Sequence, residues 1–360
     1  MKAKRKEILK LSERLIKVKS VSSNYKGLKA VLAEVEKEVD KFFVKSFSKS
    51  KSPSLLVYSS ASLPKKFKVI LNAHLDVVPG RPQQFKPKVN KGRLYGRGAY
   101  DMKAAAAVEI LVFKELAKKL PYPIGLQLVT DEEVGGFAGT KHQIEKGVRA
   151  DFVIAGEPTD LEINNAAKGI IWAKVYATGV SAHGAYPWLG ENAILIINKF
   201  LDELLKIYPV PRSEVWSTTV NVASIQTENT SYNTVPDKAF VLLDIRYIPD
   251  DKEKVLEDLK SLAKKYKLDL EIVLKEPEHF TPKTDPNIFL LQKATTKIRG
   301  RKSRIVVKHG GSDIRHYNAV GCEGITFGPV GAGHHTEEEW VDIQSLEDFY
   351  LILKEYLLSL

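Results

Sequence analysis

Residues 68–76 read KVILNAHLD, a short apolar run that ends in a histidine and an aspartate. Runs of this length, bounded by polar residues, predict buried β-strands. The segment at 100–120, YDMKAAAAVEILVFKELAKKL, instead carries apolar residues at three- and four-residue spacing, which predicts a helix. Two further apolar runs follow it, GLQLVT at 125–130 and DFVIAG at 151–156. Strands separated by helices predict an α/β sheet covered by helices on both faces.

The middle of the chain has a different order of elements. Its patterns predict, in sequence, a strand at 170–179, a helix at 191–208, strands at 217–227 and 238–248, a helix at 251–266 and a strand at 268–277. This β-α-β-β-α-β order is the ferredoxin-like arrangement. Because it is complete in itself, we expect a separate domain over 169–279, inserted into a first domain made of 1–168 and 280–360.

Composition and charge exclude several classes of protein. A chain of 360 residues with 44% hydrophobic and 28% charged residues fits a soluble protein of two domains. The net charge is +11, but the lysines are spread over predicted helix faces among glutamates. The densest basic run, KSFSKSKSPS at 45–54, is predicted to be a loop. Since no nucleic-acid-binding motif accompanies this charge, we expect no nucleic-acid partner.

The chain also lacks the marks of a membrane or secreted protein. Residues 1–20 show no continuous apolar core of a signal peptide, and the most apolar helix contains Glu109, so we expect no membrane span. The single cysteine, Cys322, excludes an internal disulfide framework and is expected to be a buried small residue. These features predict a cytoplasmic protein.

Histidine and carboxylate residues stand where the predicted strands of the first domain end. They are His74 and Asp76 after the first run, Glu132 and Glu133 after the second, Glu157 after the third, and Asp101 just before the helix. The carboxyl ends of strands form the ligand crevice of open α/β sheets. Carboxylates gathered there without cations would repel one another, so the combination points to a metal site.

Taken alone, each of these residues has an ordinary structural explanation. His74 and Asp76 could be a structural pair, because side chains two apart share one face of a strand. Asp101 could cap the helix that follows it, and Glu132-Glu133 could lie on an exposed turn. The segment GAGHHTEEEW at 331–340 is equally open, since it could be a metal site or a solvated acidic loop.

Together, the motifs resemble a known family of co-catalytic zinc amidohydrolases. HLDVV, GRGAYDMK, TDEEVGG, GEPT, SAHGAYP, NTVP, GGSD and a C-terminal HxxxE are similar, in order, to those of the acetylornithine deacetylase and succinyl-diaminopimelate desuccinylase family. That family also includes aminoacylases and carboxypeptidases. The resemblance spans nearly the whole chain. It implies a zinc-peptidase-like α/β catalytic domain with an inserted ferredoxin-like lid and dimerisation domain.

The resemblance also assigns metal ligands. It implies two Zn²⁺ ions per subunit, with Co²⁺ or Mn²⁺ as possible substitutes. Asp101 would bridge the two ions, His74 and Glu157 would complete one shell, and Glu133 and His335 the other. His335 takes the ligand position when the segment is aligned on FGPV before it and on HxxxE, in which Glu339 is the family glutamate. His334 is then a neighbour, and Glu337 and Glu338 belong to a solvated rim.

Three further residues receive catalytic roles from the same resemblance. Glu132 resembles the general base, which takes a proton from a water shared by the two ions as that water attacks an amide carbonyl. Asp76 resembles the residue that orients His74. His183 in SAHGAYP resembles the histidine that reaches the site from the partner subunit, which implies a homodimer. The peptide bond after Asp101 is expected to be cis.

The family's substrate-binding positions match Asn233, Arg246, Gly311 and Ser312. An arginine can hold a substrate carboxylate with two hydrogen bonds, but Arg246 could equally pair with a carboxylate of its own domain. The resemblance therefore predicts deacylation of an N-acyl amino acid, such as N-succinyl-diaminopimelate or N-acetylornithine. The alternative is a dipeptidase or carboxypeptidase of the same family, because the motif residues report the amide bond and not its flanks.

Overall fold

The computed structural model describes residues 2–360, which divide into two compact units. Unit 1 contains the chain up to Asn165, together with Phe280–Val306 and Ser312–Leu360. Unit 2 contains Ala166–His279 and the short segment Val307–Gly311. The segment expected to form an inserted domain, 169–279, lies within unit 2, whereas nothing in the sequence pattern assigned Val307–Gly311 to it.

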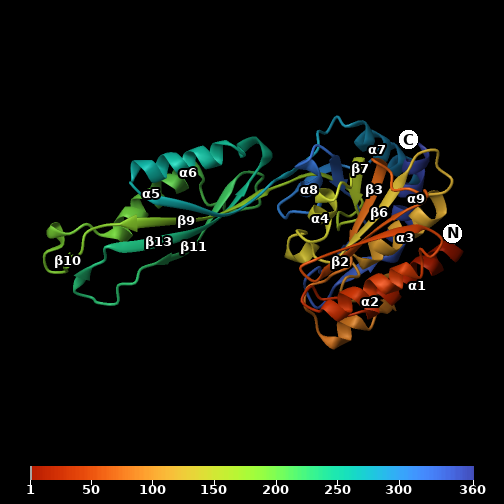
Figure 1. Ribbon diagram of the computed structural model, residues 1–360, viewed down its shortest axis with the longest axis horizontal. Coiled ribbons are helices and arrows are strands. Elements are labelled where there is room, and N and C mark those ends of the chain that lie inside the picture. Colours follow the sequence, from red (N-terminus) through yellow and green to blue (C-terminus); the bar gives the residue numbers. More distant parts are fainter. Residues whose placement is uncertain (1) are drawn as a thin grey trace. The chain divides into compact units, whose positions relative to one another are not determined.

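Unit 1 is built on a large mixed β-sheet (Figure 1). Its strands, in sheet order, are β1 (Phe43–Lys49), β2 (Ser52–Tyr58), β6 (Ile124–Val129), β3 (Phe67–His74), β7 (Ala150–Ala155), β17 (Glu323–Thr326), β8 (Ile163–Ala167) and β15 (His279–Phe280), and β16 (Ile305–Lys308) also pairs with β8. The central strands β6, β3, β7 and β17 run parallel, and β1 and β2 are antiparallel. The predicted α/β fold class is confirmed.

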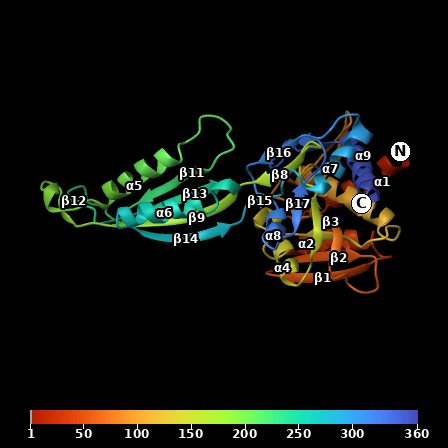
Figure 2. The same ribbon diagram turned by 90° about the horizontal axis from the view of Figure 1, so that it is seen from above.

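Helices cover both faces of this sheet. One face packs against α1 (Lys2–Lys17), α2 (Tyr25–Glu36), α3 (Lys103–Leu116), α7 (Pro286–Arg299) and α9 (Ile343–Leu358), and the other against α4 (Thr140–Glu145) and α8 (Ile314–Asn318). Figure 2 shows α4 and α8 on one side of β3 and β17, and α7 and α9 on the other. Within β3, Leu71 and Ala73 belong to the core shared with α3 and α9, whereas Ile70 belongs to the core shared with α4 and α8. A strand buried on both faces explains why KVILNA carries no polar alternation.

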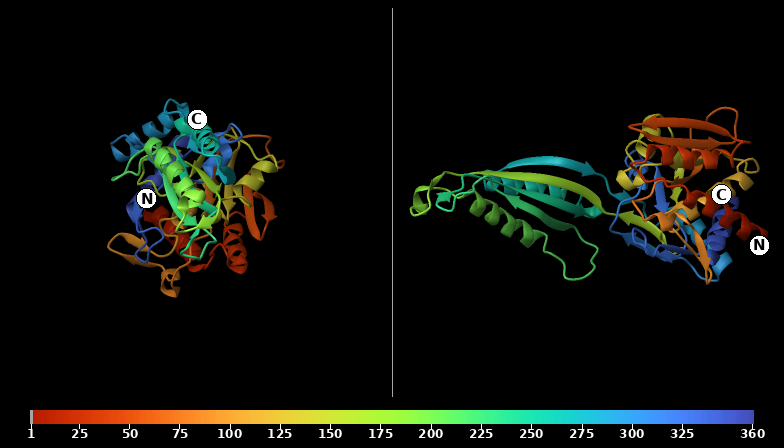
Figure 3. Two further views of the ribbon diagram at one scale, coloured as in Figure 1. Left: turned by 90° about the vertical axis from the view of Figure 1, so that its left-hand side faces the viewer. Right: turned by 90° about the horizontal axis from the view of Figure 1, so that it is seen from below.

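The basic run at 45–54 is not the loop that its composition predicted. It lies in the β1–β2 hairpin, whose strands pair from Phe43 opposite Tyr58 to Lys49 opposite Ser52. Ser50 and Lys51 make the turn, with φ of 50° and 63°. The side chains of β1 are exposed except for half-buried Lys45 and buried Phe47, and the hairpin ends the sheet (Figure 3). Lysines at an exposed sheet edge discourage pairing with other chains.

Unit 2 has the predicted β-α-β-β-α-β order. Its elements are β9 (Gly169–Thr178), α5 (Ala193–Ile207), β11 (Thr219–Gln226), β13 (Lys238–Tyr247), α6 (Lys254–Lys265) and β14 (Asp269–Glu276). The strands pair antiparallel in the order β11-β13-β9-β14. Both helices lie along one face, as Figure 1 shows, and close a separate core around Phe200 and Val241. A short ladder, β10 (Ala182–His183) with β12 (Thr234–Val235), carries the SAHGAYP motif.

A small second sheet of unit 1 supports the C-terminal histidine segment. Its strands are β18 (Gly331–Ala332), β19 (Trp340–Asp342), β5 (Arg93–Tyr95) and β4 (Lys88–Asn90). Trp340 pairs with Tyr95, so the loop between β18 and β19 lies beside the loop that leaves β5. Asp101 follows in that second loop.

None of the helices within residues 2–360 has the length and apolar character needed to cross a bilayer. Cys322 is buried and not paired with another cysteine, as its sequence context predicted.

Candidate metal centre

Three parallel strands deliver the first group of site residues to one edge of the sheet. His74 is the last residue of β3 and lies opposite Val129 near the end of β6, while Asn72 lies opposite Ala155 at the end of β7. The segments beyond these strand ends therefore meet. Glu132 and Glu133 begin a 3₁₀ turn, η2 (Glu132–Val134), directly after β6.

Asp101 lies between the two predicted ligand histidines. One oxygen, Oδ1, is 3.0 Å from His74 Nε2, and the other, Oδ2, is 3.3 Å from His335 Nε2. The peptide bond between Asp101 and Met102 is cis. A carboxylate that offers one oxygen toward each of two imidazoles has the arrangement required of a bridging ligand.

The remaining carboxylates complete two overlapping groups. Glu133 Oε2 is 3.1 Å from His335 Nε2, and Glu157 Oε1 is 3.8 Å from His74 Nε2. Within the described residues, ligand atoms converge in two sets, one of His74, Asp101 and Glu133 and one of His74, Glu132 and Glu157. The predicted base Glu132 therefore lies close enough to His74 and Glu157 to be a ligand itself. The five residues proposed as ligands and the base lie together.

Asp76 lies behind the cluster and contacts both His74 and the turn that carries Glu132 and Glu133. It is fully buried, and its carboxylate accepts hydrogen bonds from the backbone N–H groups of Glu132 and Glu133, both at 3.2 Å. It also accepts one from the Ser22 hydroxyl at 2.9 Å. Its Oδ1 is 3.5 Å from His74 Nδ1, and its backbone oxygen is 3.0 Å from the same nitrogen. Asp76 thus contacts both the histidine and the turn that carries the glutamates.

The electrostatics of the cluster are those of a site built for cations. Burial lowers the pKa of His74, but hydrogen bonds to Asp101 and Asp76 outweigh it and leave that pKa well above its usual value. Burial raises the pKa of Asp101, yet His335 and His74 bring it below the ordinary range. Burial, and then the charge of Glu157, raises the pKa of Glu132, and burial also raises the pKa of Glu133. Crowded carboxylates therefore resist ionisation until positive charge is supplied.

The segment GAGHHTEEEW separates into residues with different surroundings. His335, with φ of 63° and a side chain 49% exposed, turns toward Asp101 and Glu133. The His334 ring contacts the rings of Tyr100 and His335 edge-on, with centroids 6.1 and 5.6 Å away. Glu337 and Glu338 are exposed, whereas Glu339 is buried. The structure thus brings only one of the two histidines to the carboxylates.

The predicted substrate-binding residues lie mostly in unit 2, whereas the cluster is built from unit 1. His183 is exposed in β10, and its Nδ1 accepts the N–H of Ala185. Asn233 is also exposed, and its backbone oxygen accepts the N–H of Gly184. Gly311 falls in the Val307–Gly311 segment of unit 2. Ser312 begins a new stretch of unit 1, and its buried hydroxyl has no hydrogen-bond partner within residues 2–360.

Arg246 pairs with a carboxylate of its own domain, one of the two possibilities that the sequence left open. Its Nε and Nη2 donate to the two carboxylate oxygens of Asp244 at 2.9 and 3.2 Å. The indole N–H of Trp172 donates to the same carboxylate at 3.2 Å. About a third of the arginine side chain stays exposed, so part of the guanidinium is still open to solvent.

Sequence reasoning missed the groups that hold the glutamate turn. The backbone oxygen of Gly135 accepts hydrogen bonds from Arg315 Nη2 at 2.6 Å and from His316 Nε2 at 2.9 Å. Gly136, with φ of 67°, has no room for a side chain, because a Cβ there would lie 2.0 Å from Asp313 Oδ1. The glycines after the glutamates were the available signal, since they mark a close approach of backbone. Nothing in the sequence indicated that the partners would come from α8.

These residues fit a pair of divalent cations. Imidazole nitrogens and carboxylate oxygens are the donors that zinc takes when cysteine is absent. One carboxylate lies between two imidazoles, and the half-buried Glu132, Glu133 and Glu157 add further negative charge beside it. The fold and the cluster together are those of a metal-dependent hydrolase with an α/β catalytic unit.

Comparison with known proteins identifies the family. The model of peptidase family M20/M25/M40 matches residues 70–359, and the chain belongs to this family. It is therefore a metal-dependent hydrolase that acts on amide or peptide bonds. Similar solved structures are the aminopeptidase PepT from Bacillus cereus (20% identity, 98% of each chain covered, TM-score 0.79) and an M20 family metallo-carboxypeptidase from Sulfolobus solfataricus (20% identity, 98% of each chain, TM-score 0.71). A third is the Bacillus subtilis YXEP protein, a dinuclear metal-binding peptidase (15% identity, 100% of this chain and 99% of that one, TM-score 0.71).

Proposed function

We propose that the protein is a di-zinc amidohydrolase that removes the acyl group from an N-acyl amino acid, of the succinyl-diaminopimelate or acetylornithine type. The observation that carries this proposal is the position of Asp101, with one oxygen toward His74 and the other toward His335. His74 and Glu157 would hold one ion, Glu133 and His335 the other, and Asp101 both. Co²⁺ or Mn²⁺ could substitute for zinc, since metal choice also depends on availability.

Glu132 and Asp76 have different roles in the proposed reaction. Bound at this cluster, two zinc ions would lower the pKa of a water and polarise the carbonyl of the scissile amide. Glu132 receives the proton of the attacking water on its carboxylate and delivers it to the leaving amine. Asp76 keeps His74 in one orientation and also fixes the backbone of Glu132, so one buried carboxylate aligns ligand and base. Replacing Glu132 by alanine should leave zinc content near two per subunit while hydrolysis collapses.

Two cations of unit 2 support an acidic substrate. Burial, and then the nearby charge of Arg246, lowers the pKa of Lys168. Two cations that repel each other favour an anion near both, and Arg246 keeps an exposed part beyond Asp244. We assign recognition of a substrate carboxylate to Arg246, with Asn233, Gly311 and Ser312 as further contacts.

A peptidase acting on dipeptides or tripeptides is the second candidate. It is favoured by the names of similar structures, which include a tripeptidase from Staphylococcus aureus (19% identity, TM-score 0.76). The test is a panel of N-succinyl and N-acetyl amino acids, dipeptides and tripeptides, assayed with added zinc. We expect the highest kcat/KM on an acyl amino acid. Hydrolysis of peptides alone would replace the deacylase assignment with the peptidase one.

We further propose a cytoplasmic homodimer in which His183 serves the site of the partner subunit, where it would donate a hydrogen bond to the oxyanion. His183→Ala and Glu132→Ala should each be inactive alone. When the two variants are mixed and subunits exchange, dimers with one intact site should restore up to about a quarter of the activity, because subunits pair at random. No recovery in exchanged mixtures would remove His183 from the partner's site.

A further inference from the structure

Glu339 makes an unusual set of contacts for a residue four positions beyond a predicted metal ligand. Its side chain is 1% exposed, and both of its oxygens are engaged. Oε1 accepts the backbone N–H groups of Tyr100 and Asp101 at 3.0 and 3.1 Å. Oε2 accepts the backbone N–H of Gly98 at 3.1 Å and Nη1 of Arg97 at 2.6 Å.

These contacts all fall on the loop that carries the predicted bridging ligand. The backbone oxygen of Glu339 also accepts the N–H of Gly96 at 3.1 Å, so one residue binds the loop from Gly96 to Asp101 at five points. That loop belongs to no helix or sheet, and its N–H groups would otherwise need water. A buried carboxylate that collects several backbone N–H groups fixes their direction, since charged hydrogen bonds are short and strong.

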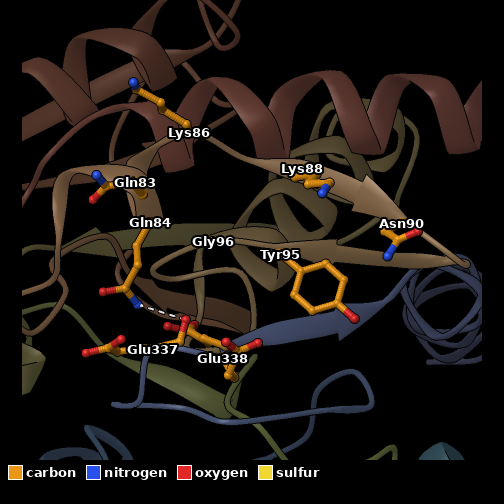
Figure 4. A pocket seen from close by; sticks show the side chains of 10 residues that line it. Gln83, Gln84, Lys86, Lys88, Asn90, Tyr95, Gly96, Glu337 and Glu338 are labelled. Atoms are coloured by element: carbon orange, nitrogen blue, oxygen red, sulfur yellow. Dashed lines mark hydrogen bonds between the residues drawn. The ribbon is translucent and has the colours of Figure 1, made fainter.

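On its other side, the segment that carries Glu339 borders open space. A cavity of about 420 Å³ separates Glu337 and Glu338 from Lys88, Asn90 and Tyr95. Figure 4 shows these two glutamates facing the β4–β5 hairpin, with the Gln84 side chain reaching across to the glutamate segment. Gln84 Nε2 donates to the backbone oxygens of Thr336 and Glu337 at 3.0 and 3.5 Å. The cavity leaves room for the segment to move if its buried anchor is lost.

We infer that Glu339 is a positioning residue that sets the spacing between Asp101 and His335, and so the separation of the two metal sites. This inference rests on the proposed function. The carboxylate of Glu339 holds the backbone of Asp101. Because Glu339 lies four residues after His335, the same contacts also restrain the loop that carries His335. Both ligands of the second predicted site other than Glu133 are therefore held through Glu339.

The test compares three variants of the full-length protein. Glu339→Gln keeps the shape of the side chain but replaces one acceptor by an NH₂ group, which faces N–H donors. Glu339→Asp keeps the charge but is one methylene too short to reach all four donors. Glu338→Gln, on the exposed neighbouring residue, is the matched control. Zinc affinity is measured by competition with a chromophoric chelator, and amide exchange of residues 96–101 is measured by mass spectrometry on the metal-free protein.

We expect Glu339→Gln to weaken binding of at least one zinc ion by about 10- to 100-fold, the range found when a residue that orients a ligand is lost. Exchange at Tyr100 and Asp101 should accelerate, and kcat should fall while KM stays within about threefold. Glu339→Asp should show a smaller loss in the same direction, and Glu338→Gln should match the wild type. If Glu339→Gln does not fold, Glu339→Asp carries the test alone.

Wild-type zinc affinity and unchanged exchange in Glu339→Gln, or in Glu339→Asp if only that variant folds, would overturn the inference. A wild-type protein that binds no zinc at all would instead refute the proposed function. The exchange measurement separates the two outcomes, because it reports the tether on loop 96–101 whether or not metal binds.

Discussion

Replacing His335 should remove one zinc ion, and replacing His334 should remove none. The imidazole of His335 lies 3.1 Å from Glu133 and 3.3 Å from Asp101, so it is one of three donors at the second predicted site. Among residues 2–360, the contacts of His334 are with the rings of Tyr100 and His335, and none is with a carboxylate. The two histidines are adjacent and both exposed, which makes His334→Ala a closely matched control.

The size of the effect follows from the number of donors. Structural zinc sites bind the ion with about 10–16 kcal/mol at neutral pH, so one of four ligands carries about 2.5–4 kcal/mol on that scale. At about 1.4 kcal/mol for each factor of ten, His335→Ala should weaken the second zinc by two to three powers of ten. The stability of the metal-free protein should change little, because the side chain is 49% exposed.

Backbone strain needs its own control at this position. His335 has φ of 63°, a conformation that costs alanine about 1 kcal/mol and costs glycine almost nothing. His335→Gly therefore removes the imidazole without strain and should lose the second zinc to the same extent. Isothermal titration of the metal-free variants gives both stoichiometry and affinity. Two tightly bound ions in His335→Gly, or a lost ion in His334→Ala, would refute the ligand assignment.

Three further predictions concern the base, the glutamate turn and the core. Glu132→Gln should lower kcat by about 10²- to 10⁴-fold, the usual contribution of a general base, with two zinc ions still bound in titration; a change in KM alone would contradict it. Burial, then the charge of Arg315, lowers the pKa of His316 to about 3, so neutral His316 stabilises the fold above about pH 6.5 and loses that contribution as the pH falls toward 3. Urea unfolding of metal-free protein should therefore show the wild type losing stability relative to His316→Gln by about 1.4 kcal/mol per pH unit across this range; parallel pH profiles would exclude it. Both carboxylate oxygens of buried Glu109 lack a hydrogen-bond partner within residues 2–360, so Glu109→Met should raise the free energy of unfolding by about 1–3 kcal/mol, and a loss of stability would show that an unseen partner exists.

Local patterns were sufficient to predict the strands whose ends build the cluster. KVILNA, GLQLVT and DFVIAG are apolar on both faces because helices cover both, and polar residues begin where the sheet ends. The order of elements in unit 2 could also be predicted, because apolar residues recur at helical spacing in its helices and at strand spacing in its strands. The resemblance to a family then selected His335 from two adjacent histidines, which periodicity could not do.

What escaped prediction depends on contacts between distant segments. The lysine-rich run at 45–54 forms strands because β2 offers it a partner, and composition alone does not record that pairing. Ser22, which donates to Asp76, lies in a polar stretch with no distinguishing feature. Asp244 lies two residues before Arg246, so the sequence offered two partners for the arginine, a substrate carboxylate and Asp244, and no way to rank them. In the structure Arg246 donates to Asp244. Tertiary context decides such cases.

The point where the chain leaves unit 1 has a consequence for how such proteins are assembled. Asn165 and Thr281 form two hydrogen bonds with each other, from the Thr281 N–H to the Asn165 backbone oxygen at 2.9 Å and from the Asn165 amide to the Thr281 backbone oxygen at 2.7 Å. The residues that flank the long insertion are thus immediate neighbours. A link of a few residues could replace the part of unit 2 that lies between them, Ala166–His279, without stretching the hydrolase scaffold. Such a junction lets this long insertion be gained, exchanged or lost in a single event, while the strand ends that carry the metal cluster stay in place.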